Sequence, residues 1–134
     1  MYKVVVVEDE SMVRKGIILT IDWSALDCVV VGDAANGEEG VELVDRLKPD
    51  IVVSDVKMPR MDGVEMIEQL RKQGCKAKFI ILTAYSDFKY AQSALRLGVS
   101  DYLLKPLKDG ELEGAVRKIL SVVEVGTTQA EEEA

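Results

Sequence analysis

The feature that most constrains the fold of this chain is an alternation, repeated five times, between a short apolar run and an amphipathic segment. The apolar runs are rich in Val and Ile, which suits strands buried on both faces of a parallel sheet. We place them at residues 3–7, 29–32, 51–54, 79–82 and 101–104. Strands that alternate with helices indicate an α/β fold in which helices cover both faces of the sheet.

The segments between these runs carry the signals of amphipathic helices. Val41 and Val44, for example, recur at helical spacing ahead of Pro49, which cannot continue a helix. A length of 134 residues suits one domain. We assign residues 1–124 to that domain, and residues 125–134, which turn polar and acidic, to a linker or a truncated C-terminal tail.

Composition and charge exclude several classes of function. Apolar residues make up 48% of the chain, but no apolar run approaches the ~20 residues that cross a bilayer, so we expect no contact with a membrane. The apolar stretch at the N-terminus is too short for a signal peptide, and we expect a cytoplasmic protein. The net charge of -7 argues against direct binding of nucleic acid by this segment.

The chain contains no histidine and two cysteines. The absence of histidine excludes His-based catalytic triads and most zinc sites. Cys28 and Cys75 lack the spacing of metal ligands, and we interpret them as reduced thiols. Any proton or phosphoryl chemistry must therefore depend on carboxylates, lysine and hydroxyls, or on a histidine that a partner supplies.

Polar residues with a candidate role follow four of the five predicted strands at the point where each strand ends. They are Glu8 and Asp9, Asp55, Thr83, and Lys105. Each alone is more often a helix cap, a turn residue or a solvated charge. Because the carboxyl ends of parallel strands share one edge of the sheet, where α/β proteins bind their ligands, we expect these five side chains to meet in one crevice. The second strand is followed by Asp33, to which the sequence assigns no role.

The chemistry of this cluster points to magnesium and a phosphoryl group. Neighbouring carboxylates raise one another's pKa unless cations compensate them, and Lys105 offsets only one charge. Mg²⁺ usually takes one or two carboxylates with waters and phosphate oxygens, so Glu8, Asp9 and Asp55 fit such a site. Lys105 and Thr83 can meet the phosphoryl oxygens. Asp55, on the central strand, is the best candidate for a nucleophile that becomes an aspartyl-phosphate.

Five motifs resemble those of one known family. They are Val-Glu-Asp at residues 7–9, Asp-Val-Lys-Met-Pro at 55–59, Met-Asp-Gly at 61–63, Thr-Ala at 83–84 and Asp-Tyr-Leu-Leu-Lys-Pro at 101–106. With them, residues 3 to about 124 resemble the receiver domain of bacterial two-component response regulators. The resemblance implies a flavodoxin-like, doubly wound (βα)5 fold with strand order 2-1-3-4-5. It also implies transfer of a phosphoryl group to Asp55 from a histidine of a partner kinase, which would supply the missing histidine.

The resemblance assigns further roles around the acids. It implies that Asp9 and Asp55 bind Mg²⁺ together with the backbone carbonyl of Lys57, and that Glu8 helps through a water molecule. It also implies that Lys105 pairs with the phosphoryl oxygens. Beyond its own phosphorylation and dephosphorylation, such a domain is not expected to be an enzyme.

The resemblance further implies a switch that carries the signal to the surface. Thr83 is expected to move toward the phosphoryl group, Tyr102 to turn inward behind it, and the peptide bond before Pro106 to be cis. Both switch residues border a face formed by the fourth helix, the fifth strand and the fifth helix, where we expect phosphorylation to strengthen a homodimer. Lys57 and Tyr85, each two residues after a site residue, are expected to set the lifetime of the phosphate.

Two shorter stretches resemble receivers that are joined to an AraC-type helix-turn-helix output domain. They are Ile-Asp-Trp at residues 21–23 and Tyr-Ser-Asp-Phe-Lys-Tyr-Ala at residues 85–91. Such an output domain is not part of the 134 residues. Binding of DNA and regulation of transcription are therefore expected of a longer parent protein.

Three alternatives stay open at this point. A small phosphohydrolase would also use Asp55 covalently, but Lys57 stands where such an enzyme carries a second acid. A flavodoxin-like carrier of FMN needs a first loop rich in Ser, Thr and Gly, whereas residues 8–10 are acidic and would repel its phosphate. A degenerate receiver that works by protein contact alone would lack part of the site, and no site residue is missing.

Overall fold

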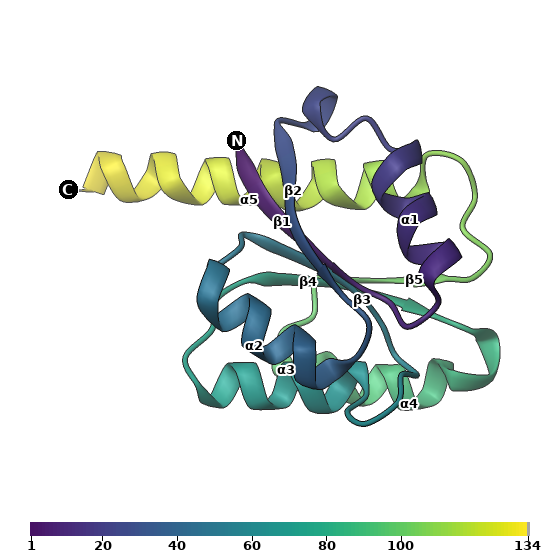
Figure 1. The fold of residues 1–134 in the computed structure, drawn as a ribbon. Helices are drawn as coiled ribbons and strands as arrows, with labels where there is room; N and C mark the ends of the chain where they lie inside the picture. The colour runs from purple at the N-terminus through teal and green to yellow at the C-terminus, as the bar shows by residue number, and fades with distance from the viewer. Residues whose placement is uncertain (134) are drawn as a thin grey trace.

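Strands and helices alternate along the chain in a computed structural model that describes residues 1–133, with the side chains of residues 1–122 (Figure 1). The strands are β1 (Tyr2–Val7), β2 (Cys28–Ala34), β3 (Ile51–Asp55), β4 (Lys78–Thr83) and β5 (Asp101–Leu104). The α-helices are α1 (Ser11–Thr20), α2 (Gly37–Leu47), α3 (Gly63–Lys72), α4 (Phe88–Gln92) and α5 (Glu111–Glu133). Short 3-10 helices occupy Ser24–Leu26, Tyr85–Asp87 and Ser93–Leu97. The alternation predicted from the sequence is confirmed.

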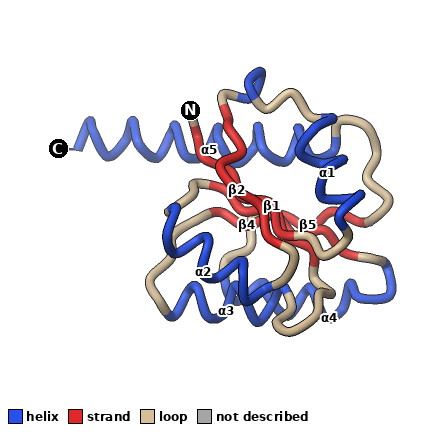
Figure 2. Tube along the Cα trace, in the orientation of Figure 1, coloured by secondary structure: helices blue, strands red, loops and turns tan. Residues whose placement is uncertain are grey.

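The strands form one parallel sheet in the order β2-β1-β3-β4-β5. This confirms the flavodoxin-like order that the resemblance implies. Helices α1 and α5 lie on one side of the sheet, and α2, α3 and α4 lie on the other (Figure 2). Because all strands run the same way, their carboxyl ends share one edge.

Strand β1 shows why the sheet sits between two helical layers. Successive side chains of a strand point to opposite faces. Val4 and Val6 pack into the core under α1 and α5, whereas Val5 and Val7 pack into the core under α2, α3 and α4. All four are fully buried, and burying a valine contributes roughly 1.5–3 kcal/mol. The unbroken run of valine is therefore the signature of a strand without a solvent face.

Several strand boundaries differ from the expected ones by one or two residues, and two of these differences concern acidic residues. β3 includes Asp55, which pairs with Leu82 of β4. β2 continues to Ala34, so Asp33 belongs to the strand and not to the loop after it. In both cases, hydrogen bonding to the neighbouring strand extends past the end of the apolar run.

Two helical segments also differ from expectation. The segment expected as one fourth helix is divided, because α4 is flanked by the 3-10 helices Tyr85–Asp87 and Ser93–Leu97. Helix α5 continues to Glu133, through the segment expected as a linker or tail, and extends past the sheet in Figure 1. The domain boundary at residue 124 stays a prediction. Within the described residues, none of the helices combines the length and apolar character needed to cross a membrane.

Candidate functional site

The carboxyl ends of β1 and β3 bring three acids together. One carboxylate oxygen from each of Glu8, Asp9 and Asp55 lies within 4.8 Å of the others. Glu8 is completely buried, Asp55 is 7% exposed, and Asp9 faces solvent. Glu10, the N-cap residue of α1, makes no side-chain capping bond. Three hard oxygen donors, of which Asp9 is exposed to solvent, fit Mg²⁺, which takes carboxylates and keeps several waters.

Lys105 follows β5 and reaches both buried acids. Its Nζ lies 2.9 Å from Asp55 Oδ2 and 3.3 Å from Glu8 Oε2. Its backbone N–H donates to the carbonyl of Thr83 at 2.9 Å, which ties the loop to the end of β4. The peptide bond between Lys105 and Pro106 is cis. One ammonium group thus balances part of the charge of two carboxylates.

The charges of these residues influence one another. Burial, reinforced by the hydrogen bond and charge of Asp55, raises the pKa of Glu8 to about 7, although Lys105 acts to lower it. Burial acts to lower the pKa of Lys105, but its hydrogen bonds and charge interactions with Asp55 and Glu8 outweigh burial and raise that pKa. The cluster is therefore short of positive charge, which a bound divalent cation supplies.

Asp55 is held in one orientation by the backbone around it. Its Oδ1 accepts a hydrogen bond from the N–H of Val56 at 2.8 Å, while Oδ2 accepts from Lys105. Gly63, the first residue of α3, passes so close that a Cβ there would collide with the carbonyl oxygen of Asp55. Only glycine fits at that position. The carboxylate is consequently presented at the end of β3 by a tightly packed turn.

The two predicted switch residues lie on β4 and β5. Thr83 is buried, and its hydroxyl donates to the carbonyl of Ala84 at 3.1 Å. The Tyr102 ring packs edge-to-face on Phe88 of α4, with ring centroids 6.4 Å apart, and contacts the core under α2, α3 and α4. Its hydroxyl is buried without a hydrogen-bond partner among the described residues, and burial raises its pKa. Tyr102 therefore lies inward and touches α4.

Lys57 lies in the loop after β3, and Tyr85 begins the 3-10 helix after β4. The Lys57 side chain is 78% exposed and lies 3.7 Å from Asp87. Tyr85 is 83% exposed. Both side chains are accessible to solvent.

Sequence reasoning missed two polar contacts next to the site. Arg14 of α1 pairs with Asp33 at 2.7 Å, and Tyr90 of α4 donates to Asp62, the N-cap of α3, at 2.7 Å. The unassigned acid near the end of the second strand was the one signal for the first contact. The second had no signal, because a hydrogen bond between two helices depends on how they pack.

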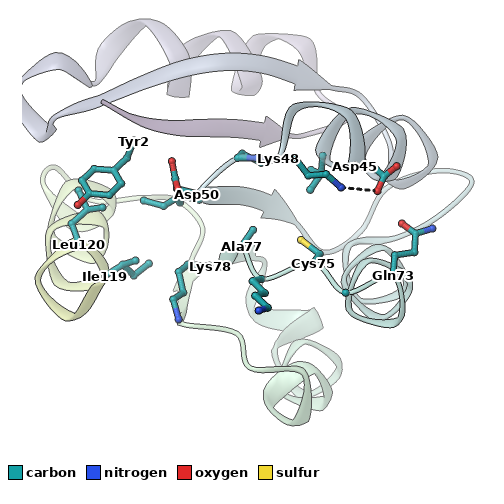
Figure 3. Close-up of a pocket in the computed structure, with 15 residues that line it drawn as sticks. Tyr2, Asp45, Lys48, Asp50, Gln73, Cys75, Ala77, Lys78, Ile119 and Leu120 are labelled. Carbon is teal, nitrogen blue, oxygen red and sulfur yellow. Dashed lines mark hydrogen bonds and ion pairs between the residues drawn. The ribbon is translucent and has the colours of Figure 1, made fainter. Parts of the chain in front are cut away.

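A cavity of about 530 Å³ lies at the opposite edge of the sheet (Figure 3). Its walls come from the starts of β1 and β4, the ends of α2 and α3, and α5. Its acids already have partners, because Asp50 accepts from the N–H of Lys3 at 2.8 Å and Asp45 pairs with Lys48 at 3.3 Å. Among the described residues, the one group of three acids placed to hold a metal ion is at the carboxyl edge. The chemistry of the chain is therefore expected there.

Comparisons with known proteins agree with this geometry. A family model described as the response regulator receiver domain matches residues 4–117. The chain is 36% identical over 121 residues to the uncharacterized transcriptional regulatory protein YesN of Bacillus subtilis, which covers 90% of this chain and 33% of that protein. It is 34% identical over 113 residues to the transcriptional regulatory protein HptR of Staphylococcus aureus, and this match covers 84% of this chain and 44% of that protein. The chain spans less than half the length of these relatives.

Solved structures share the fold. The REC domain of AraT, a response regulator from Geobacillus stearothermophilus, matches with a TM-score of 0.88 and 38% identity over 94% of this chain and 98% of that one. A two-component transcriptional regulator AraC from Clostridium phytofermentans matches with a TM-score of 0.83 and 29% identity, over 92% of this chain and 97% of that one.

Proposed function

Because this chain belongs to the family of response regulator receiver domains, we propose that Asp55 accepts a phosphoryl group from a histidine of a partner kinase. The observation that carries the proposal is the position of Asp55 at the end of β3, 2.9 Å from Lys105 and grouped with Glu8 and Asp9. An Asp55 oxygen bonds to phosphorus as the bond from phosphorus to the kinase nitrogen breaks, and the electron pair stays with that imidazole. The chain itself has no histidine.

The proposed metal ligands are the carboxylates of Asp9 and Asp55 and the backbone carbonyl of Lys57, with Glu8 acting through a water molecule. The grouping of the three carboxylates within 4.8 Å supports this set. When bound, Mg²⁺ supplies positive charge that stabilises the transferring phosphoryl group. Because Asp9 is exposed and Glu8 is buried, the phosphoryl group is proposed to enter from the side of Asp9.

Lys105, Thr83 and Tyr102 are proposed to turn the phosphoryl group into a change of packing. Lys105 already bonds to Asp55 and can pair with a phosphoryl oxygen attached to it. The Thr83 hydroxyl, which bonds to the next carbonyl, can turn to a phosphoryl oxygen instead. Tyr102 of β5 contacts Phe88 of α4, so a movement of the Tyr102 ring reaches α4.

The proposed response is a homodimer formed through the face of α4, β5 and α5. Leu95, which follows α4, Leu104 of β5 and Val122 of α5 are exposed. Charged residues of both signs accompany them: Lys89, Arg96, Asp101, Lys108, Glu111 and Arg117. A two-fold interface can place such residues opposite their counterparts in a second copy.

The longer parent protein is proposed to regulate transcription through an AraC-type output domain. Support comes from the share of YesN that the chain covers, 33%, and from the similarity to AraT and to the AraC regulator. Contacts with DNA would then belong to the output domain, in line with the net charge of -7 here. We place the protein in the cytoplasm, where its two cysteines stay reduced.

Incubation with acetyl phosphate and Mg²⁺, followed by intact mass, tests the proposal. The wild type is expected to gain one phosphoryl group, and Asp55→Asn to gain none. Asp45→Asn, which changes an acid at the opposite edge, is the matched control and is expected to react as the wild type does. Labelling that persists in Asp55→Asn would contradict the proposal. Repeated turnover of a small phosphate ester would favour a phosphohydrolase instead.

A further inference from the structure

Arg14 of α1 joins two segments that come together beside the acids. Its Nη1 donates to the carbonyl oxygen of Glu8 at 2.6 Å, and its Nε donates to Asp33 Oδ2 at 2.7 Å. The Arg14 side chain is 17% exposed, so the pair is partly shielded from water. A guanidinium group presents its donors in a rigid planar fork. Here the fork binds a strand side chain and a loop backbone at once.

Asp33 reaches Arg14 because of an irregularity in the pairing of β1 with β2. The paired residues are Val4 with Val30, Val5 with Gly32, and Val6 with Asp33. One extra residue in β2 therefore shifts the register, and a shift of one residue moves each following side chain to the other face of the sheet. Asp33 consequently shares the face of Val6, which α1 covers, instead of facing α2.

The carbonyl that Arg14 binds belongs to the peptide unit between Glu8 and Asp9. The N–H of Glu8 donates to the carbonyl of Ala34, at the end of β2, at 3.0 Å. Glu10 does not cap α1 with its side chain, and the Asp9 side chain makes no hydrogen bond or ion pair within the described residues. The bond from Arg14 is therefore the contact that orients the peptide unit from which Asp9 projects.

We propose that Arg14, oriented by Asp33, is a positioning residue that holds Asp9 ready to bind Mg²⁺. This inference rests on the proposed function. The positioning role and the charge of Arg14 predict opposite effects on Mg²⁺ binding when Arg14 is replaced. A cation near a metal site repels the metal, so loss of the Arg14 charge by itself would strengthen binding. Loss of the positioning contact weakens binding instead, and removing groups that orient metal ligands typically weakens affinity about tenfold or more.

The test measures binding of Mg²⁺ through the melting temperature, without a phosphoryl donor. A ligand that binds the native state raises the melting temperature once its concentration exceeds its Kd, so a titration gives that Kd. Arg14→Met is expected to raise the Kd about tenfold. Lys15→Met is the matched control, because Lys15 is adjacent and exposed, and its side chain makes no contact of this kind in the described chain. Its Kd is expected to stay at or slightly below the wild-type value.

A double variant tests the part assigned to Asp33. If Asp33 acts through Arg14, Asp33→Asn alone raises the Kd, and Arg14→Met with Asp33→Asn has the same Kd as Arg14→Met alone. If the two residues act only as independent charges, their effects oppose each other and cancel in the double variant, which overturns the inference.

The metal site and the positioning role of Arg14 are overturned by different outcomes. A wild type with no Mg²⁺-dependent rise in melting temperature overturns the metal site of the proposed function, and the positioning role with it. A rise in the wild type with an unchanged or lower Kd in Arg14→Met overturns the positioning role alone.

Discussion

At the scale of single residues, Glu8 occupies an environment that makes its protonation matter for stability. It is completely buried, 3.3 Å from Lys105 and grouped with the carboxylate of Asp55. Burial and Asp55 raise its pKa from 4.5 to about 7. Because the folded protein binds this proton more tightly than the unfolded chain, the resulting stabilisation is complete below pH 4.5 and is lost as the pH rises through about 7.

The metal-free protein is therefore expected to lose stability as the pH rises from 5 to 8. Glu8 contributes up to about 3 kcal/mol to this fall in the free energy of unfolding. Urea denaturation in EDTA at several pH values measures it. Glu8→Gln should flatten the profile, whereas Glu42→Gln, at an exposed position of α2, should leave it unchanged. Equal slopes for Glu8→Gln and the wild type would contradict the explanation.

At the scale of elements, the connection from β3 to α3 is packed without spare room. The N–H of Gly63 donates to the carbonyl of Val56 at 2.8 Å. The N–H of Gly37 in α2 donates to the carbonyl of Met61 at 2.9 Å. A Cβ on either glycine would collide with a backbone carbonyl. The loop that follows Asp55 is thus held by two helices at once, and its glycines are required by close approach.

Gly63→Ala is expected to displace this loop, lower the free energy of unfolding by about 2 kcal/mol or more, and reduce phosphorylation of Asp55. Gly114→Ala in α5 is the matched control, because nothing lies within 4 Å of a Cβ added there. It should stabilise the protein by about 0.5–1 kcal/mol, as alanine favours a helix. Denaturation and intact mass after acetyl phosphate measure both effects. A fully stable, normally phosphorylated Gly63→Ala would disprove the packing argument.

The elements also show what sequence could predict. Strand positions and the edge where Glu8, Asp55 and Lys105 meet were predictable, because apolar runs are local signals and parallel strands end together. The face of the sheet on which Asp33 lies was not predictable, because it depends on one extra residue in β2 where that strand pairs with β1. The division around α4 and the bond from Tyr90 to Asp62 also escaped prediction, because both depend on tertiary packing.

At the scale of the whole molecule, the proposed site and the proposed dimer face lie on adjoining parts of the surface. β5 supplies both Tyr102, which packs on Phe88, and the exposed Leu104. A shift of α4 against β5 would therefore reshape the contact surface directly. A coupling of about 1–3 kcal/mol between phosphorylation and dimerisation would change the dimer constant several-fold to a hundredfold.

Sedimentation with a stable phosphoryl mimic is expected to show more dimer than sedimentation without it. Leu104→Glu should abolish this increase, because it puts a charge into an apolar contact, while phosphorylation by acetyl phosphate continues. Leu19→Glu, at an exposed position of α1, which is not part of this face, is the control and should dimerise as the wild type does. Dimerisation that survives Leu104→Glu would exclude this face.

The course of α5 limits how a signal can leave the domain. At the carboxyl edge of the sheet, Leu112 and Lys105 line one cavity. Leu120 lies with Tyr2 in the cavity at the opposite edge (Figure 3). The 23 residues of the helix span about 35 Å. Salt at physiological strength screens charges over about 8 Å. At that salt concentration, a domain joined beyond α5 lies out of range of the electric field of a phosphate on Asp55, so the signal has to reach it through a change in packing or in assembly.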